Sequence, residues 1–367
     1  MRRAVIIAVV VAAALACARA ALSARPRVLF NVGGRVQSPL ASSGQWVTWL
    51  EGEEQERRLM VVGRSGGRAK VLLKSAGLSG LAADSGAAYV TRAASDQARG
   101  GPTPSEVEGR TPNELLAVSL SGGAARKLAD LSEAADQIVS SQGWLAWRKS
   151  REPALPGVPF VAAAAPVTVI RAVAREGGTP HVIAVLGGGQ TVRRGGLDLL
   201  GIARDSVYWY ERNTTPEGER TAIRRAPCSG GGIETVAVAD GSRAAALDGD
   251  VLIWTAPSLE AGNPGTFSSV RRMELGRPGV KVIGDWLDSG TILLLSNGRA
   301  YAQDRGSLWR LSAKREEQAR LYEGPPRLVS PRAIGDEEFM FMQLDLGVAL
   351  AKRPLTLWAR VRSAVWR

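Results

Sequence analysis

The sequence predicts an all-β protein, a β-propeller of about seven four-stranded blades, and three observations support this fold class. A short turn of Gly, Ser or Asp followed by an apolar or aromatic strand recurs along the 367-residue chain. Further short strands follow it, usually across a Gly-Gly turn, with a period of roughly fifty residues. No clear helical periodicity accompanies this pattern. Six or eight blades remain open, and tandem β-sandwiches are the alternative fold.

The repeat is clearest between Ser206 and Ala239. Residues 207–210 are aromatic and β-branched, which favours a mostly buried strand. Residues 211–220 are predicted to form a polar loop, because Pro216, Gly218 and several charges break the apolar pattern. A third stretch, residues 229–232, is Gly-rich and predicts a tight turn before the next strand.

Equivalent elements recur along the whole chain. Aromatic or apolar strands are predicted at residues 46–49, 88–90, 144–147, 207–210, 251–254, 291–294 and 339–341. Each of these is followed by a strand that begins near Leu59, Leu115, Val169, Ala222, Val270, Leu308 or Leu357. An outer strand comes next, at residues 70–73, 126–128, 181–185, 234–238, 280–283 and 318–322. Innermost strands precede the turns, as at 198–203 and 243–247, so the aromatic or apolar strand is second in its blade.

The final repeat supplies strands at residues 329–333, 338–342 and 357–361 and lacks an outer strand. Residues 27–31 can provide it. Pairing of residues 27–31 with residues 357–361 would close the ring and remove exposed sheet edges. The chain is therefore expected to form a single propeller domain over residues 21–367.

The N-terminus has the features of an export signal over residues 1–20. A basic Met1-Arg2-Arg3 precedes an apolar run over residues 4–15, and small residues follow at a cleavage site. The apolar run is short for a membrane span. We expect a periplasmic or extracellular protein. The alternatives are an uncleaved N-terminal segment that tethers the chain to a membrane, and a lipid-anchored Cys17.

Charge and cysteine content limit the possible partners. The formal charge is +12, and loss of Arg2, Arg3 and Arg19 with the signal would leave +9. The charge comes largely from evenly spread arginines, without a basic helix or stripe, so nucleic acid is not an expected partner. Anionic envelope polymers or lipid headgroups are the alternative to a merely solvated basic surface. Without Cys17, Cys228 is alone and no internal disulfide is expected.

The repeat resembles a known group of exported bacterial propellers. Val207-Tyr208-Trp209, then Ile223-Arg224-Arg225, then Ser229-Gly230-Gly231 is similar to the TolB-like and YWTD-like repeat type, which is itself WD40-like in architecture. Residues 308–311, Leu-Trp-Arg-Leu, fit the same position in the repeat. The resemblance implies the fold and an export route. The YWTD tetrapeptide is absent, those families usually have six blades, and no binding residue is carried over.

Candidate catalytic motifs have simpler structural explanations. Residues 63–67 match G-x-S-x-G, but no helix follows, as a nucleophile elbow would require. His181 is the only histidine, which leaves little for a His-based metal or acid–base site. A ring of calcium sites at the Asp-containing turns would have too few carboxylates per turn. We expect neither a cofactor nor a metal.

Five long loops are predicted on one face, at residues 92–113, 148–166, 211–220, 256–268 and 344–354. Long loops on a rigid scaffold often carry function. A ligand-binding rim there would consist of Trp49, Arg92, Trp147, Arg148, Tyr210, Glu211 and Trp254. The alternative is that the aromatic rings fill the space between blades.

The predicted function is a non-catalytic binding or protein-interaction scaffold of the cell envelope. Its partner would be a protein, a peptide or an envelope polysaccharide held on the long-loop face. The alternative is a carbohydrate-active hydrolase or lyase that uses two carboxylates near the pore.

Overall fold

The computed structural model describes most of the chain between Arg27 and Lys352. The described residues are 27–30, 40–53, 56–84, 86–93, 113–141, 143–151, 167–186, 197–215, 218–257, 267–288, 291–304, 307–323, 328–335, 338–343 and 347–352. The expected signal at residues 1–20, together with Cys17, lies outside them. In the described part of the chain no helix is long and apolar enough to cross a membrane.

The described strands form seven four-stranded antiparallel sheets, which we call blades 1 to 7 in chain order. Blade 1 is β2 (Ala41–Ser43), β3 (Trp46–Glu53), β4 (Glu56–Gly63) and β5 (Lys70–Ser75). Blade 2 is β6 (Leu78–Asp84), β7 (Ala87–Arg92), β8 (Asn113–Ser119) and β9 (Arg126–Leu131). Blade 3 is β10 (Gln137–Ser140), β11 (Trp144–Arg151), β12 (Val167–Ala174) and β13 (His181–Leu186). Blade 4 is β14 (Leu197–Ala203), β15 (Ser206–Thr215), β16 (Gly218–Pro227) and β17 (Glu234–Val238).

Blades 5 and 6 are also built from strands that are consecutive in the sequence. Blade 7 combines strands from the two ends of the described chain. Blade 5 is β18 (Ala245–Asp248), β19 (Val251–Pro257), β20 (Phe267–Glu274) and β21 (Val280–Asp288). Blade 6 is β22 (Ile292–Ser296), β23 (Arg299–Asp304), β24 (Ser307–Arg310) and β25 (Ala319–Glu323). Blade 7 is β26 (Leu328–Gly335), β27 (Glu338–Gln343) and β28 (Gly347–Lys352), with β1 (Arg27–Phe30) added at its outer edge.

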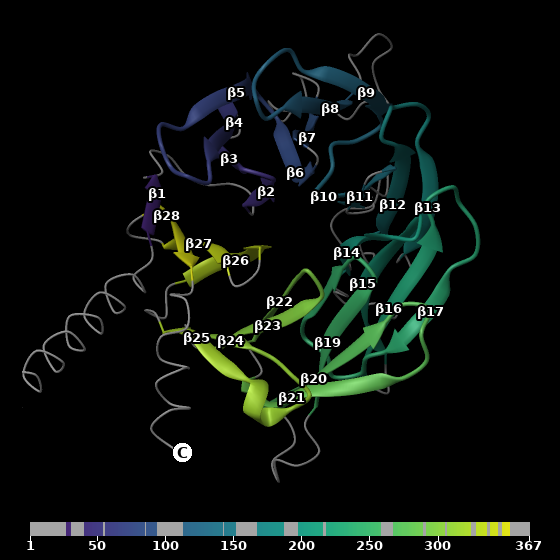
Figure 1. The fold of residues 1–367 in the computed structure, drawn as a ribbon. Coiled ribbons are helices and arrows are strands. Elements are labelled where there is room, and N and C mark those ends of the chain that lie inside the picture. The colour runs from purple at the N-terminus through teal and green to yellow at the C-terminus, as the bar shows by residue number, and fades with distance from the viewer. Residues whose placement is uncertain are drawn as a thin grey trace, which may run out of the picture.

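The blades are arranged radially around a centre, as Figure 1 shows. The first strand of each blade lies innermost. From β2 to β22, each of these strands contacts the innermost strand of the next blade, in the order β2, β6, β10, β14, β18, β22 and β26. The predicted fold class, a β-propeller, is therefore confirmed. Except for β1, every blade is a simple antiparallel meander, so its strand order needs only local connections.

Alternation along the second strand of each blade sends side chains into both neighbouring interfaces. In β15, Val207 and Trp209 pack into an apolar cluster with blade 3, and Tyr208 and Tyr210 pack into a cluster with blade 5. Among the described residues, five apolar clusters each join two consecutive blades, from blades 1 and 2 to blades 5 and 6. The core is therefore distributed between the blades rather than collected in one centre.

The hairpin of blade 4 corrects one predicted loop. Residues 211–220 were expected to be a polar loop, but β15 extends to Thr215 and β16 starts at Gly218, with Glu211 opposite Ala222 and Thr215 opposite Gly218. Continuous antiparallel pairing satisfies the backbone polar groups of this charged segment, so the hairpin persists without an apolar sequence.

Blade 6 corrects the predicted strand assignment. Residues 291–294 were expected to form the second strand of a blade, but β22 is innermost and β23, a strand that sequence reasoning missed, is second. The turn between them is Asn297-Gly298, with φ of 51° and 71°. Two left-handed residues form the tight hairpin turn for which Asn-Gly is the strongest sequence signal.

The C-terminal strand also lies elsewhere than predicted. Residues 357–361 were expected to pair with residues 27–31, and residues 344–354 were expected to be a long loop. Instead β28 lies within that loop and β1 pairs with it, Arg27 opposite Leu350. The short connection after β27 lets residues 347–352 form the next strand at once, and residues 357–361 lie outside the described residues.

Candidate functional site

The meander gives the molecule two unlike faces. One face, which we call the long-loop face, carries the connections between second and third strands and those between blades. Three of the predicted long loops correspond to such connections. The flanking strands extend into them, so that residues 93–112, 152–166 and 258–266 lie between the strands. The opposite face carries the tight turns, such as Gly63–Lys70 and Ser119–Arg126, and we call it the tight-turn face.

The four aromatic residues expected to form a binding rim are buried. Trp49 and Trp147 are each 1% exposed, and Tyr210 and Trp254 are nearly as inaccessible. Trp147 packs between blades 2 and 3, and Trp254 packs between blades 4 and 5. The prediction of a rim of exposed aromatic rings is therefore wrong, because these rings fill the inter-blade space, as in the alternative interpretation.

The same second strands place other large rings in equivalent inter-blade positions. Tyr89, Trp209 and Tyr301 are also fully buried in their strands. Each blade with described side chains thus inserts at least one ring from its second strand. The buried indole Nε1 atoms of Trp209 and Trp254 have no hydrogen-bond partner among the described residues, so packing rather than polar contact holds these rings.

Arg92 lies on the long-loop face and pairs across the strands of blade 2. It ends β7 opposite Glu114, and both its Nε and Nη2 donate to Glu114 Oε2. Lys127 of the next strand lies 3.8 Å from Glu114 and 2.6 Å from Asp130. The Arg92 side chain is 40% exposed, so part of its guanidinium surface remains available to a ligand.

Arg148 connects blades 3 and 4. Its Nε donates to Gln137 Oε1 at 2.9 Å and its Nη2 lies 3.2 Å from Asp198 Oδ1. The same Gln137 amide accepts from the backbone N–H of Leu199 and donates to its carbonyl, both at 2.9 Å. Sequence reasoning missed Gln137, whose signal is only its position at the start of an innermost strand.

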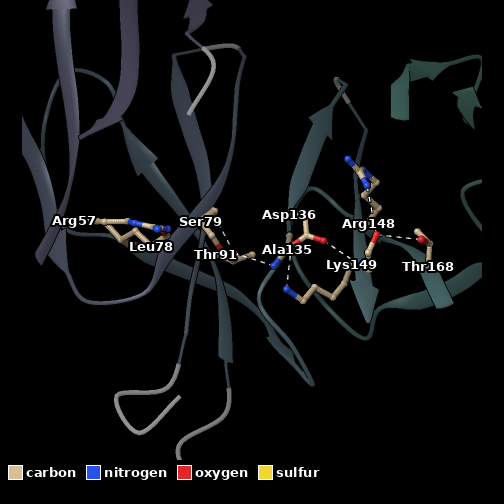
Figure 2. A network of polar contacts seen from close by, with 10 residues as sticks. Arg57, Leu78, Ser79, Thr91, Ala135, Asp136, Arg148, Lys149 and Thr168 are labelled. Atoms are coloured by element: carbon tan, nitrogen blue, oxygen red, sulfur yellow. Dashed lines mark hydrogen bonds and ion pairs between the residues drawn. The ribbon is translucent and has the colours of Figure 1, made fainter. Parts of the chain in front are cut away.

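Figure 2 shows how this network continues along the long-loop face. Asp136 accepts from Lys149 Nζ at 2.9 Å and from the backbone N–H of Ser150 at 2.8 Å. In blade 2, Thr91 Oγ1 donates to the Ser79 carbonyl and accepts from the N–H of Ala135, the residue before Asp136. These contacts fix the inter-blade connection that precedes β10.

Glu211, the remaining candidate, pairs within blade 4. Its Oε2 lies 2.9 Å from Arg224 Nε, and its side chain is largely shielded. Beside it, the Tyr210 hydroxyl donates to the Ser242 carbonyl in the connection to blade 5. Of the seven candidates, the structure therefore brings the charged ones to one face as ion pairs spread over blades 2, 3 and 4.

The motifs considered for catalysis lie in ordinary structural positions. The G-x-S-x-G segment is the turn after β4, where the Gly66 N–H donates to the Gly63 carbonyl at 2.8 Å and a strand follows. His181 begins the outer strand β13, is exposed and lies edge-on to Trp144. Among the described residues, no group of three or more His, Cys, Asp or Glu side chains could hold a metal.

Comparison with known proteins supports the fold. No family model matches the chain. No curated protein sequence matches it either. The solved structure of a Pyrococcus horikoshii acylaminoacyl peptidase is similar with a TM-score of 0.58 and 13% identity, over 86% of this chain and 50% of that one. The chain thus spans about half the length of that peptidase.

Two further solved structures are covered over most of their own length. Oligogalacturonate lyase in complex with manganese has a TM-score of 0.57 at 12% identity, over 86% of this chain and 87% of that one. The β-propeller domain of the trilobed protease from Pyrococcus furiosus has a TM-score of 0.52 at 11% identity, over 88% and 93%. At these identities the similarity shows the propeller fold and not an activity.

The burial of the aromatic rings predicts their effect on stability. Trp254→Ala is expected to lower the free energy of unfolding by about 3–5 kcal/mol, because it removes inter-blade contacts and leaves a cavity. Trp254→Phe keeps a ring and loses no hydrogen bond among described residues, so it is expected to lower the free energy of unfolding by less than Trp254→Ala does. Urea unfolding followed by circular dichroism measures both. Val185→Ala, on the exposed side of β13, is the control, and equal stability of Trp254→Ala and this control would contradict the assignment.

Proposed function

We propose that this propeller is an exported, TolB-like or YWTD-like binding module of the cell envelope, whose long-loop face holds a protein, a peptide or an envelope polysaccharide. The observation that carries the proposal is the difference between the two ends of the blades. Three connections of nine to twenty residues join strand ends on the long-loop face, and the two in blades 2 and 3 follow the strands that carry Arg92 and Lys149. Loops on a rigid scaffold are where binding concentrates.

The chemistry of this face suits a polar partner. Arg92 and Lys127 share Glu114, and Arg148, Lys149, Asp136 and Asp198 alternate in sign along blades 3 and 4. Arginine donors with fixed orientation recognise carboxylates or phosphates, and the carboxylates accept from hydroxyl or amide groups. Ion pairs within blades 2 and 3 and between blades 3 and 4 hold these side chains in place before a ligand arrives, which lowers the entropic cost of binding.

An enzyme remains the competing proposal. Its support is the similarity, over nearly the whole length, to a structure of oligogalacturonate lyase. A carbohydrate-active lyase or hydrolase would turn over a uronate-containing oligosaccharide, whereas a binding module would retain it unchanged. Turnover by the purified chain would replace the binding proposal with this one.

Arg92→Gln tests the face against a matched arginine on the opposite face. We expect retention on isolated cell envelopes to fall roughly tenfold, because a charge-assisted contact to the partner is lost. The control is Arg225→Gln, since Arg225 is also 40% exposed and pairs across strands with Glu234, but near the tight turns. Co-sedimentation with polysaccharide sacculi and with membrane fractions measures retention. Equal loss for both variants, with melting temperatures unchanged, would contradict a site on the long-loop face.

The proposed export depends on the apolar N-terminal segment. Replacement of Val9 and Val10 by Asp is expected to leave the protein in the cytoplasm, because a charged apolar region does not enter the translocation route. Cell fractionation measures this, and N-terminal sequencing of the exported form should begin near Arg19 or Ala21. Export of the double variant at the normal level, or a mature form starting at a lipidated Cys17, would contradict a cleaved signal.

A further inference from the structure

A pocket of about 520 Å³ opens between blades 5 and 6 on the tight-turn face, away from the proposed binding surface. Its inner wall consists of Ile283, Ala300 and Leu311, which belong to the apolar cluster that joins these two blades. The volume is within the range of small-molecule sites. The pocket therefore combines an apolar wall with an opening to solvent.

The polar residues that line the pocket are mostly cationic. Arg272, Lys281, Arg299 and Arg310 contribute four positive charges, against the two carboxylates of Glu274 and Glu317. Both carboxylates also pair with cations outside the lining: Arg277 lies 2.7 Å from Glu274, and Lys314 lies 3.2 Å from Glu317. The local balance is therefore positive, and Lys281 has no carboxylate partner among the described residues.

An unusual turn builds the outer wall. Blades 1 to 5 join their third and fourth strands through tight Gly turns, whereas blade 6 uses residues 311–318, which include the 3₁₀ turn Arg315–Glu317. Ser312 Oγ donates to Glu317 Oε2 at 2.8 Å, and the Gln318 amide donates to the Ser312 carbonyl at 2.9 Å. These contacts fix the wall in the absence of a ligand.

Two of the four cations are held by hydrogen bonds to backbone carbonyls, and Arg272 also lies 3.5 Å from Glu274. Arg310 donates from Nε and Nη2 to the Glu317 carbonyl, and Arg272 Nη1 donates to the Gly298 carbonyl at 2.6 Å. Arg272 thereby connects blade 5 to the Asn297-Gly298 turn of blade 6. Lys281 and Arg299 are exposed, one on each of the two adjacent blades that line the pocket.

We infer that this pocket binds a small organic anion, with a phosphate or carboxylate group among the four cations and the body of the ligand against Ile283 and Leu311. Guanidinium groups match the oxygens of either anion, and a cluster of cations favours a doubly charged group. The apolar wall adds contact with an organic body that inorganic phosphate lacks. The inference is independent of the proposed function, because it concerns the other face.

Isothermal titration calorimetry at constant ionic strength tests the site. The probes are glycerol 3-phosphate, malonate and uncharged glycerol. We expect saturable binding at one site per chain, with Kd of about 1 mM or tighter, for at least one of the two anions. Binding of glycerol 3-phosphate alone would identify a phosphate site, and binding of both would extend it to carboxylates. Saturable binding of neither anion up to about 10 mM, or equal binding of glycerol, would overturn the inference.

A matched pair of double variants locates the site. Lys281→Gln with Arg299→Gln is expected to weaken anion binding roughly tenfold or more. Arg68→Gln with Lys70→Gln is the control, because it removes two exposed charges from the same face of blade 1. Equal weakening by both pairs would show that binding follows net charge and would overturn the pocket. Circular dichroism checks folding, and Lys281→Gln alone replaces the double variant if that fails to fold.

Discussion

Burial on both faces of the second strand is the constraint on which the rest of this structure depends. An isolated four-stranded sheet would expose the side chains of both faces, so each blade is stable only between two neighbours. The rings of Trp147, Trp209 and Trp254 fill the wedge between adjacent blades. Because burial occupies the strands, the strand ends and connections carry what remains for recognition.

Polar contacts between blades supplement this packing at both ends of the strands. On the long-loop face, Gln137 and Arg148 connect blade 3 to blade 4. On the tight-turn face, Arg204 pairs with Asp250 of the next blade at 2.8 Å, and Arg272 reaches the first turn of blade 6. Arginine suits these positions because its long stem spans the gap and its planar guanidinium group donates to several acceptors at once. The even spread of arginine thus has a structural use as well as an electrostatic one.

Local patterns were sufficient to predict the fold class and most strands, because turn residues and alternating apolar residues act over short distances. They failed where pairing decided the outcome, as in the charged hairpin after Tyr210 and the strand at residues 347–352. The charged site residues could be placed on one face from strand direction alone. For Trp49 and Trp254 strand alternation left two alternatives, an exposed rim or packing between blades, and only the neighbouring blade decides between them.

Cys228 offers the most direct measurement of the packing between blades. It is buried between blades 3 and 4, and burial raises the pKa of its thiol to about 12, with a further contribution from Asp205. At pH 8 it holds roughly a thousandfold less thiolate than an ordinary cysteine. In a Cys17→Ser chain, a disulfide reagent should leave Cys228 unmodified until urea separates the blades, and then react with one thiol per chain. Rapid stoichiometric reaction of the native protein would contradict a core built between the blades.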